Sequence, residues 1–192
     1  MKEFNEKAVL KTERLILRFL EEGDREAIFS NINHDREVLK YYVTSYEEKL
    51  EDFSLKKMIE YYMQNEMYIF AIVLRESREV IGNILQCNRP SSHMHTVEVG
   101  YAIGKKYWNE GYTSEALKAM IDFLFDQGVH KVTACHIVEN TASGRVMEKC
   151  GMKYEGRKID DIFYRESYHD TLNYCIINEG ENNGTLHGCE VQ

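Results

Sequence analysis

The strongest constraint on the fold is a segment with strand-like alternation followed closely by one with helical periodicity. In 97–103 the side chains alternate as in a half-buried strand, and in 114–127 apolar residues recur at helical spacing before Gly128. Gly111 lies between these segments and permits a tight backbone turn. A helix that begins at such a turn presents unpaired N–H groups and partial positive charge. The sequence therefore predicts a strand, a turn and a helix whose N-terminus binds phosphate.

Similar patterns predict the other elements. Strands are expected at 15–20, 67–75, 80–87, 129–138, 157–163 and 168–177. Helices are expected at 24–32, where Asp24 is the predicted N-cap, and at 37–42, 50–64 and 141–149. This alternation favours an α/β (α+β) fold in which a mixed sheet has helices on both faces.

Composition narrows the class of protein. The 192 residues suit one domain, which we place at 1–178, and the polar segment 179–192 is expected to be a disordered tail. A net charge of -8 argues against nucleic acid as a partner and favours a cationic acceptor. No apolar run suits a membrane span or a secretory signal. The five cysteines form no CxxC pair, which predicts free thiols, a cytoplasmic protein and no metal site; His93 and His95 are interpreted as solvated loop residues.

Four stretches of the chain resemble, in order, motifs of the GNAT superfamily of N-acetyltransferases. They are 12–18, 81–84, 97–103 with 107–116, and 140–143 with 148–152 and 155–156. Together they are similar to the RimJ/RimL-like branch, which acetylates the N-termini of ribosomal proteins. The superfamily pattern Gln/Arg-x-x-Gly-x-Gly/Ala appears here as Trp108-x-x-Gly111-x-Thr113, so Thr113 departs from it. The turn has neither a Walker A sequence nor GxGxxG.

The resemblance implies a GNAT fold with a mostly antiparallel sheet of about seven strands. It also implies acetyl-CoA as co-substrate, with no metal, and direct attack of an amine on the thioester in a ternary complex. The residues expected to bind the cofactor lie on the strand, the turn and the two later helices: Val99, Tyr101, Ile103, Trp108, Asn109, Glu110, Gly111, Tyr112, Thr113, Ser114, Asn140, Ser143 and Lys149.

Two of the candidate residues carry chemistry. Glu98 is the preferred general base, because a carboxyl in an apolar strand is expected to have a raised pKa; the alternative is a structural glutamate paired with an arginine or tyrosine. By resemblance, Ser143 is the candidate that protonates the leaving thiolate or contacts its sulfur; the alternative is an ordinary polar residue of the first helical turn. Asn140 is expected to contact the pantetheine arm, to cap the helix, or both.

The acceptor stays open at this point. A protein N-terminus is one hypothesis, and a small amine such as a polyamine, amino acid or antibiotic is another. A non-catalytic acyl-CoA-binding module is the third. The acceptor site is expected at 37–64 and 88–96, and the protein is expected to be a monomer or a homodimer.

Overall fold

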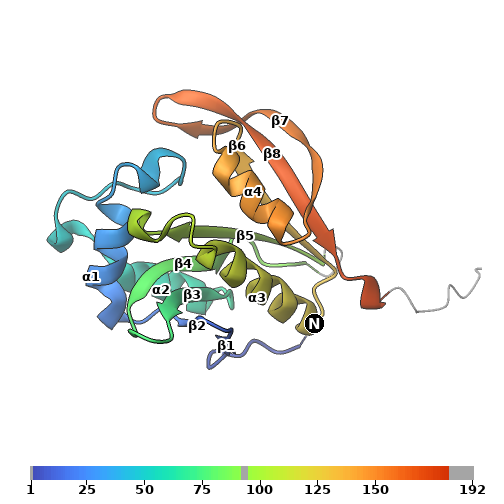
Figure 1. Cartoon of the computed structure of the whole chain (residues 1–192), viewed down its shortest axis with the longest axis horizontal. Coiled ribbons are helices and arrows are strands. Elements are labelled where there is room, and N and C mark those ends of the chain that lie inside the picture. The colour runs from blue at the N-terminus through green and yellow to red at the C-terminus, as the bar shows by residue number, and fades with distance from the viewer. Residues whose placement is uncertain (1, 92–94, 182–192) are drawn as a thin grey trace, which may run out of the picture.

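A sheet of eight strands forms the centre of the molecule (Figure 1), in the order β1-β2-β3-β4-β5-β6-β8-β7. The computed structural model describes residues 2–91 and 95–181. Every neighbouring pair is antiparallel except β5 and β6, which are parallel. The strands are β1 (Val9–Lys11), β2 (Leu15–Phe19), β3 (Ile69–Leu74), β4 (Val80–Gln86), β5 (Thr96–Ile103), β6 (Lys131–Ile137), β7 (Lys153–Tyr164) and β8 (Ser167–Ile177). This confirms the mixed, mostly antiparallel sheet, with β1 added to the predicted strands.

Helices cover both faces of the sheet, as the alternation predicted. The helices are α1 (Arg25–Ile28), α2 (Leu55–Gln64), α3 (Tyr112–Asp126) and α4 (Thr141–Lys149). Apolar residues of α3 and α4 pack in one cluster with Val97 and Val99 of β5. Those of α1 and α2 pack in a second cluster with Ala102. The alternation along β5 therefore directs its side chains into two separate cores.

Three predicted helices differ from the structure in their extent. Asp24 occupies the predicted N-cap position of α1 but makes no side-chain cap bond there, because its carboxylate accepts hydrogen bonds from the Arg18 guanidinium at 2.7 and 2.8 Å and from the Glu21 amide at 2.9 Å. The α-helix that follows has only four residues and continues as a π-helical turn, Phe29–Asn33. The segment 37–42 forms only a 3-10 turn, Val38–Lys40. The helix expected at 50–64 is interrupted at buried Phe53, whose extended backbone separates the 3-10 turn Leu50–Asp52 from α2.

The sheet divides between β5 and β6. Their parallel pairing joins only 96–98 to 131–133, so it ends at Glu98. Beyond Glu98, β5 stays paired with β4 and β6 stays paired with β8. In Figure 1, α4 lies between β5 and the part of the sheet that β6, β8 and β7 form. In residues 2–91 and 95–181 no other strand pairs with this edge of β5.

Three predicted features, the C-terminal tail, His93 and the acceptor loop 88–96, fall partly or wholly outside the described residues. Of the predicted tail, Glu179–Glu181 form a 3-10 turn and 182–192 lie outside. His93 also lies outside. Among the helices of the described segments, none has the length and apolar character needed to cross a bilayer.

Candidate active site

The turn before α3 has the backbone geometry of an anion site. A 3-10 turn, Lys105–Tyr107, leads to Asn109 with φ 66° and Gly111 with φ 81°. Gly111 occupies the N-cap position of α3, and no described side chain caps this helix. The N–H groups of its first turn are therefore left for a ligand. Gly111 adopts its positive φ without steric cost, because a glycine has no Cβ.

Trp108 connects this turn to the end of β5 by a hydrogen bond. Its indole Nε1 donates a hydrogen bond to the Ile103 carbonyl at 3.0 Å, while 39% of the residue stays exposed. Trp108 was predicted to bind cofactor, and the structure adds that its ring fixes the path of the chain from strand to helix.

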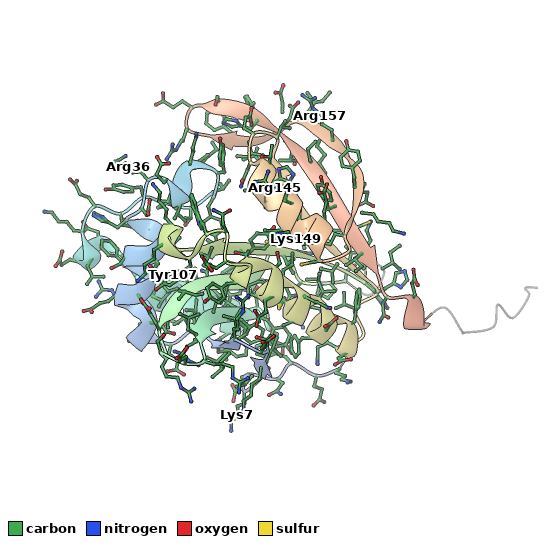
Figure 2. All side chains as sticks on the ribbon, viewed as in Figure 1. Lys7, Arg36, Tyr107, Arg145, Lys149 and Arg157 are labelled. Carbon is green, nitrogen blue, oxygen red and sulfur yellow. The ribbon has the colours of Figure 1, made fainter. Side chains whose placement is uncertain are left out.

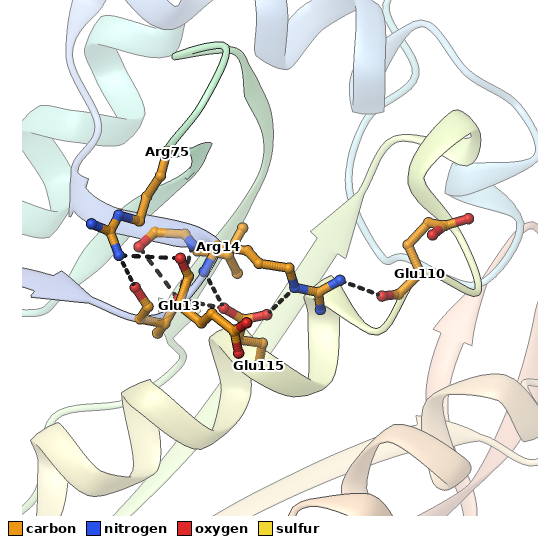
Figure 3. A network of polar contacts seen from close by, with 7 residues as sticks. Glu13, Arg14, Arg75, Glu110 and Glu115 are labelled. Carbon is orange, nitrogen blue, oxygen red and sulfur yellow. Dashed lines mark hydrogen bonds and ion pairs between the residues drawn. The ribbon is translucent and has the colours of Figure 1, made fainter.

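A polar network ties the turn to the start of β2 (Figure 3). The Arg14 guanidinium donates to the Glu110 carbonyl at 3.0 Å and to the Glu115 carboxylate at 2.7 Å, and lies 4.4 Å from the Tyr112 ring centroid. Glu115 also accepts from the Thr12 hydroxyl at 2.5 Å and the Arg14 amide at 2.9 Å. Burial raises the pKa of Glu115, but these hydrogen bonds together outweigh it and hold that pKa below its usual range. Arg14 and Glu115 lie 101 residues apart, so no local pattern indicated their contact.

Tyr101 and Ser143 connect β5 to α4, the helix that follows β6. Their hydroxyls are 2.9 Å apart, and the Tyr101 hydroxyl lies 3.2 Å from the Ser143 carbonyl. Burial raises the pKa of Tyr101 above its ordinary value, although the bond to Ser143 opposes this. Asn140 accepts from the Ser143 amide at 3.4 Å and caps α4, as predicted. The structure therefore brings Tyr101, Asn140 and Ser143 together.

Glu98 lies at the point where β5 and β6 separate. Its backbone is held by Asn88, whose Oδ1 accepts from the Glu98 amide at 2.6 Å. Its carboxylate accepts from the Cys135 thiol of β6 at 3.4 Å. Burial, and next the Glu98 carboxylate, raise the pKa of Cys135 to about 12. Cys135 is therefore a neutral thiol near pH 7, and its position marks the face of the sheet to which Glu98 points.

Three other residues predicted to bind the cofactor lie on β5 and at the end of α4. Val99 and Ile103 are 2% and 6% exposed and pack in the core, so only their backbone faces the gap between β5 and β6. Lys149 is at the other end of α4 from Ser143. Its neighbour Cys150 donates to the Ser114 carbonyl at 3.2 Å, which places this end of α4 beside the start of α3. Figure 2 shows Arg145 and Lys149 along α4. No group of three metal-ligating side chains occurs within 2–91 and 95–181.

Comparison with known proteins identifies the fold and its chemistry. Residues 14–153 match the model of the acetyltransferase (GNAT) domain. The structure superposes with a TM-score of 0.77 on a GNAT-family acetyltransferase from Bacillus anthracis, which is 31% identical, over 88% of this chain and 98% of that one.

Relatives along nearly the whole chain include an uncharacterized N-acetyltransferase, YoaA, from Bacillus subtilis, 29% identical over 90% of this chain and 98% of the relative. The ribosomal protein uS5-alanine N-acetyltransferase of Escherichia coli is 25% identical over 85% of this chain and 88% of its own length. The spermidine N(1)-acetyltransferase of Vibrio cholerae is 24% identical over 85% and 93%.

Proposed function

The chain belongs to the GNAT acetyltransferase family and is an N-acetyltransferase, and from this premise we propose that it transfers the acetyl group of acetyl-CoA to the N-terminal amine of a polypeptide. The observation that carries the proposal is the separation of β5 from β6 directly after Glu98, with Tyr101 and Ser143 meeting across it. This arrangement leaves an unpaired strand edge, a carboxylate and two hydroxyls around one opening.

The residues present fit coenzyme A. The uncapped first turn of α3, with the backbone of 108–114, would hold the pyrophosphate through N–H groups, and Lys149 would add positive charge beside it. The free edge of β5 would pair with the amides of the pantetheine arm, as an added strand pairs with a sheet. Asn140 and Ser143 lie opposite this edge. Bound acetyl-CoA supplies a thioester that an amine can attack.

Glu98 and Ser143 then have separate roles. The Glu98 carboxylate takes a proton from the acceptor ammonium, and the neutral amine then attacks, so that a nitrogen–carbon bond forms as the carbon–sulfur bond breaks. The Ser143 hydroxyl gives a proton to the departing thiolate and regains the second proton that the acetylated nitrogen releases. Tyr101, bonded to that hydroxyl at 2.9 Å and kept protonated by burial, orients it and shares the proton.

Thiol release from acetyl-CoA with a panel of N-terminal peptides and small amines tests the proposal. We expect peptides to be acetylated, and Glu98→Gln to lower kcat by about a hundredfold or more with little change in affinity for CoA. Glu60→Gln, on the exposed face of α2, is the matched control. Turnover of small amines but not of peptides would exclude a protein acceptor. CoA binding without thiol release from any acceptor would favour a non-catalytic binding module.

A further inference from the structure

A cationic cavity lies between the segment after α1 and the outer end of the β7–β8 hairpin. Its volume is about 490 Å³, and Tyr46 and Tyr164 contribute to its walls. The charged residues that line it are Arg36, Lys40 and Arg165, with Glu37 as the one carboxylate. Figure 2 places Arg36 beside the hairpin. The lining therefore has a positive balance in a chain whose net charge is -8.

The contacts around the cavity fix its walls and leave the cationic groups of its lining without a carboxylate partner in the described part of the chain. The Tyr164 hydroxyl donates to the Leu39 carbonyl at 2.6 Å and fastens the hairpin to the facing segment. The Arg36 guanidinium lies 3.9 Å from the Tyr46 ring centroid, and that of Arg165 lies 5.4 Å from the Tyr164 centroid. Stacking on a ring orients a guanidinium and leaves its N–H groups free to bind an anion. Among described residues, no ion pair involves Arg36, Lys40 or Arg165.

The cavity and Glu98 lie on the same face of the sheet. Cys135, which contacts Glu98, pairs with Asn173 of β8. Side chains alternate along a strand, so Asn173 and Ser167 point to one face. Ser167 pairs with Tyr164, a residue of the cavity wall. An acceptor whose amine reaches Glu98 on this face can therefore extend along β8 toward the cavity.

The distance between Glu98 and the cavity sets the length of an acceptor that can contact both. Asn173 and Ser167 are six residues apart on β8, which corresponds to at most about 20 Å. An extended polypeptide advances about 3.3–3.6 Å per residue, so a segment of roughly six residues spans this distance. A free amino acid is too short to contact both Glu98 and the cavity.

We propose that this cavity binds acidic side chains a few residues after the acetylated N-terminus of a polypeptide acceptor. The inference rests on the proposed function and narrows its substrate. It also reverses the expectation from the net charge that a cationic acceptor would be favoured, because Arg36, Lys40 and Arg165 repel positive charge where the acceptor extends.

The test compares three hexapeptides that share their first two residues and carry Asp, Asn or Lys at the other positions. Dissociation constants are measured by fluorescence anisotropy with saturating CoA, and kcat/KM by thiol release. We expect the Asp peptide to bind about fivefold to tenfold more tightly than the Asn peptide, and the Lys peptide to bind most weakly. Free aspartate, which cannot reach the cavity, should show no such advantage over alanine.

The double variant Arg36→Gln/Arg165→Gln should abolish the preference for Asp and leave affinity for CoA unchanged. Arg78→Gln, in the turn between β3 and β4, is the matched control and should keep the preference. Equal binding of all three peptides, or tightest binding of the Lys peptide, would overturn the inference. Equal acetylation of the peptides would leave the proposed function standing. Absence of acetylation, with the Asp peptide still bound most tightly, would overturn the proposed function and leave only the binding of acidic peptides by the cavity.

Discussion

The hydroxyls of Tyr101 and Ser143 lie 2.9 Å apart and join β5 to the first turn of α4, beyond the point where β5 leaves β6. This contact lies beyond Glu98, the last residue of β5 that pairs with β6. The contact therefore fixes the position of the Ser143 hydroxyl, the candidate proton donor, relative to β5.

Replacing Tyr101 with Phe removes this contact and keeps the ring. We expect kcat to fall about tenfold, because Ser143 loses its partner, and the free energy of unfolding to fall by about 1 kcal/mol. Burial raises the pKa of Tyr101, so its hydroxyl stays protonated to at least about pH 10. The alkaline side of the pH profile of kcat/KM should therefore be the same in Tyr101→Phe as in the parent protein. Tyr168→Phe, on the exposed hairpin, is the control, and an equal loss of kcat there would contradict this role.

Glu115 should make stability depend on pH. Its pKa is depressed in the folded protein, so its contribution is fully present above the unfolded pKa of about 4.3 and is lost as the pH falls through the folded value. We expect Glu115→Gln to lower the free energy of unfolding at pH 7 by about 1 kcal/mol and to flatten the decline below about pH 5. Urea titrations between pH 3 and pH 7 measure both effects.

Glu60→Gln is the comparison for that series, since Glu60 forms only an exposed pair with Lys56 at 3.9 Å. It should change stability little at any pH. If Glu115→Gln and the parent protein lost stability in parallel as the pH fell, Glu115 would not be the titrating group.

Gly82 on β4 should tolerate no side chain. A Cβ there would lie 2.2 Å from the Ala102 carbonyl oxygen, which belongs to the backbone of β5 and cannot rotate away. We expect Gly82→Ala to lower the free energy of unfolding by about 3 kcal/mol, because β4 and β5 would have to move apart. Gly156→Ala is the matched change, since nothing lies within 4 Å of its Cβ position. Thermal unfolding of both variants decides the point, and similar melting temperatures would refute it.

Cys135 should react slowly with alkylating agents in the folded protein. Burial, and then Glu98, raise the pKa of its thiol to about 12, whereas an unfolded cysteine has a pKa of about 8.5. At pH 8 the thiolate fraction is then roughly a thousandfold lower than in the unfolded chain. Iodoacetamide labelling followed by peptide mass spectrometry measures the rates.

The same experiment tests the charge on Glu98. Glu98→Gln removes the neighbouring carboxylate, so the pKa of Cys135 should fall and its labelling should accelerate. Cys150 provides the internal control, because burial raises its pKa to about 11 without a contribution from Glu98. Acceleration at both cysteines would indicate a general loosening of the fold instead.

The sequence by itself determined the elements whose pattern is local. The alternation in 97–103 predicted β5, the apolar spacing after Gly111 predicted α3, and Asn140 predicted the start of α4. The same reasoning placed an anion site at the first turn of α3. It failed at the start of α1, where the Asp24 carboxylate binds Arg18, and before α2, where the extended backbone of buried Phe53 interrupts the predicted helix.

Only the tertiary structure decided which residues meet. Arg14 and Glu115 are 101 residues apart, and Leu39 and Tyr164 are 125 apart, yet each pair forms a hydrogen-bonded contact. Their distances follow from strand order and register, which depend on how all the apolar faces pack at once. The contact between Tyr101 and Ser143, and the cluster of Arg36 with Arg165, arise in the same way. A local pattern records which face a side chain takes, but packing between distant segments sets what lies opposite it.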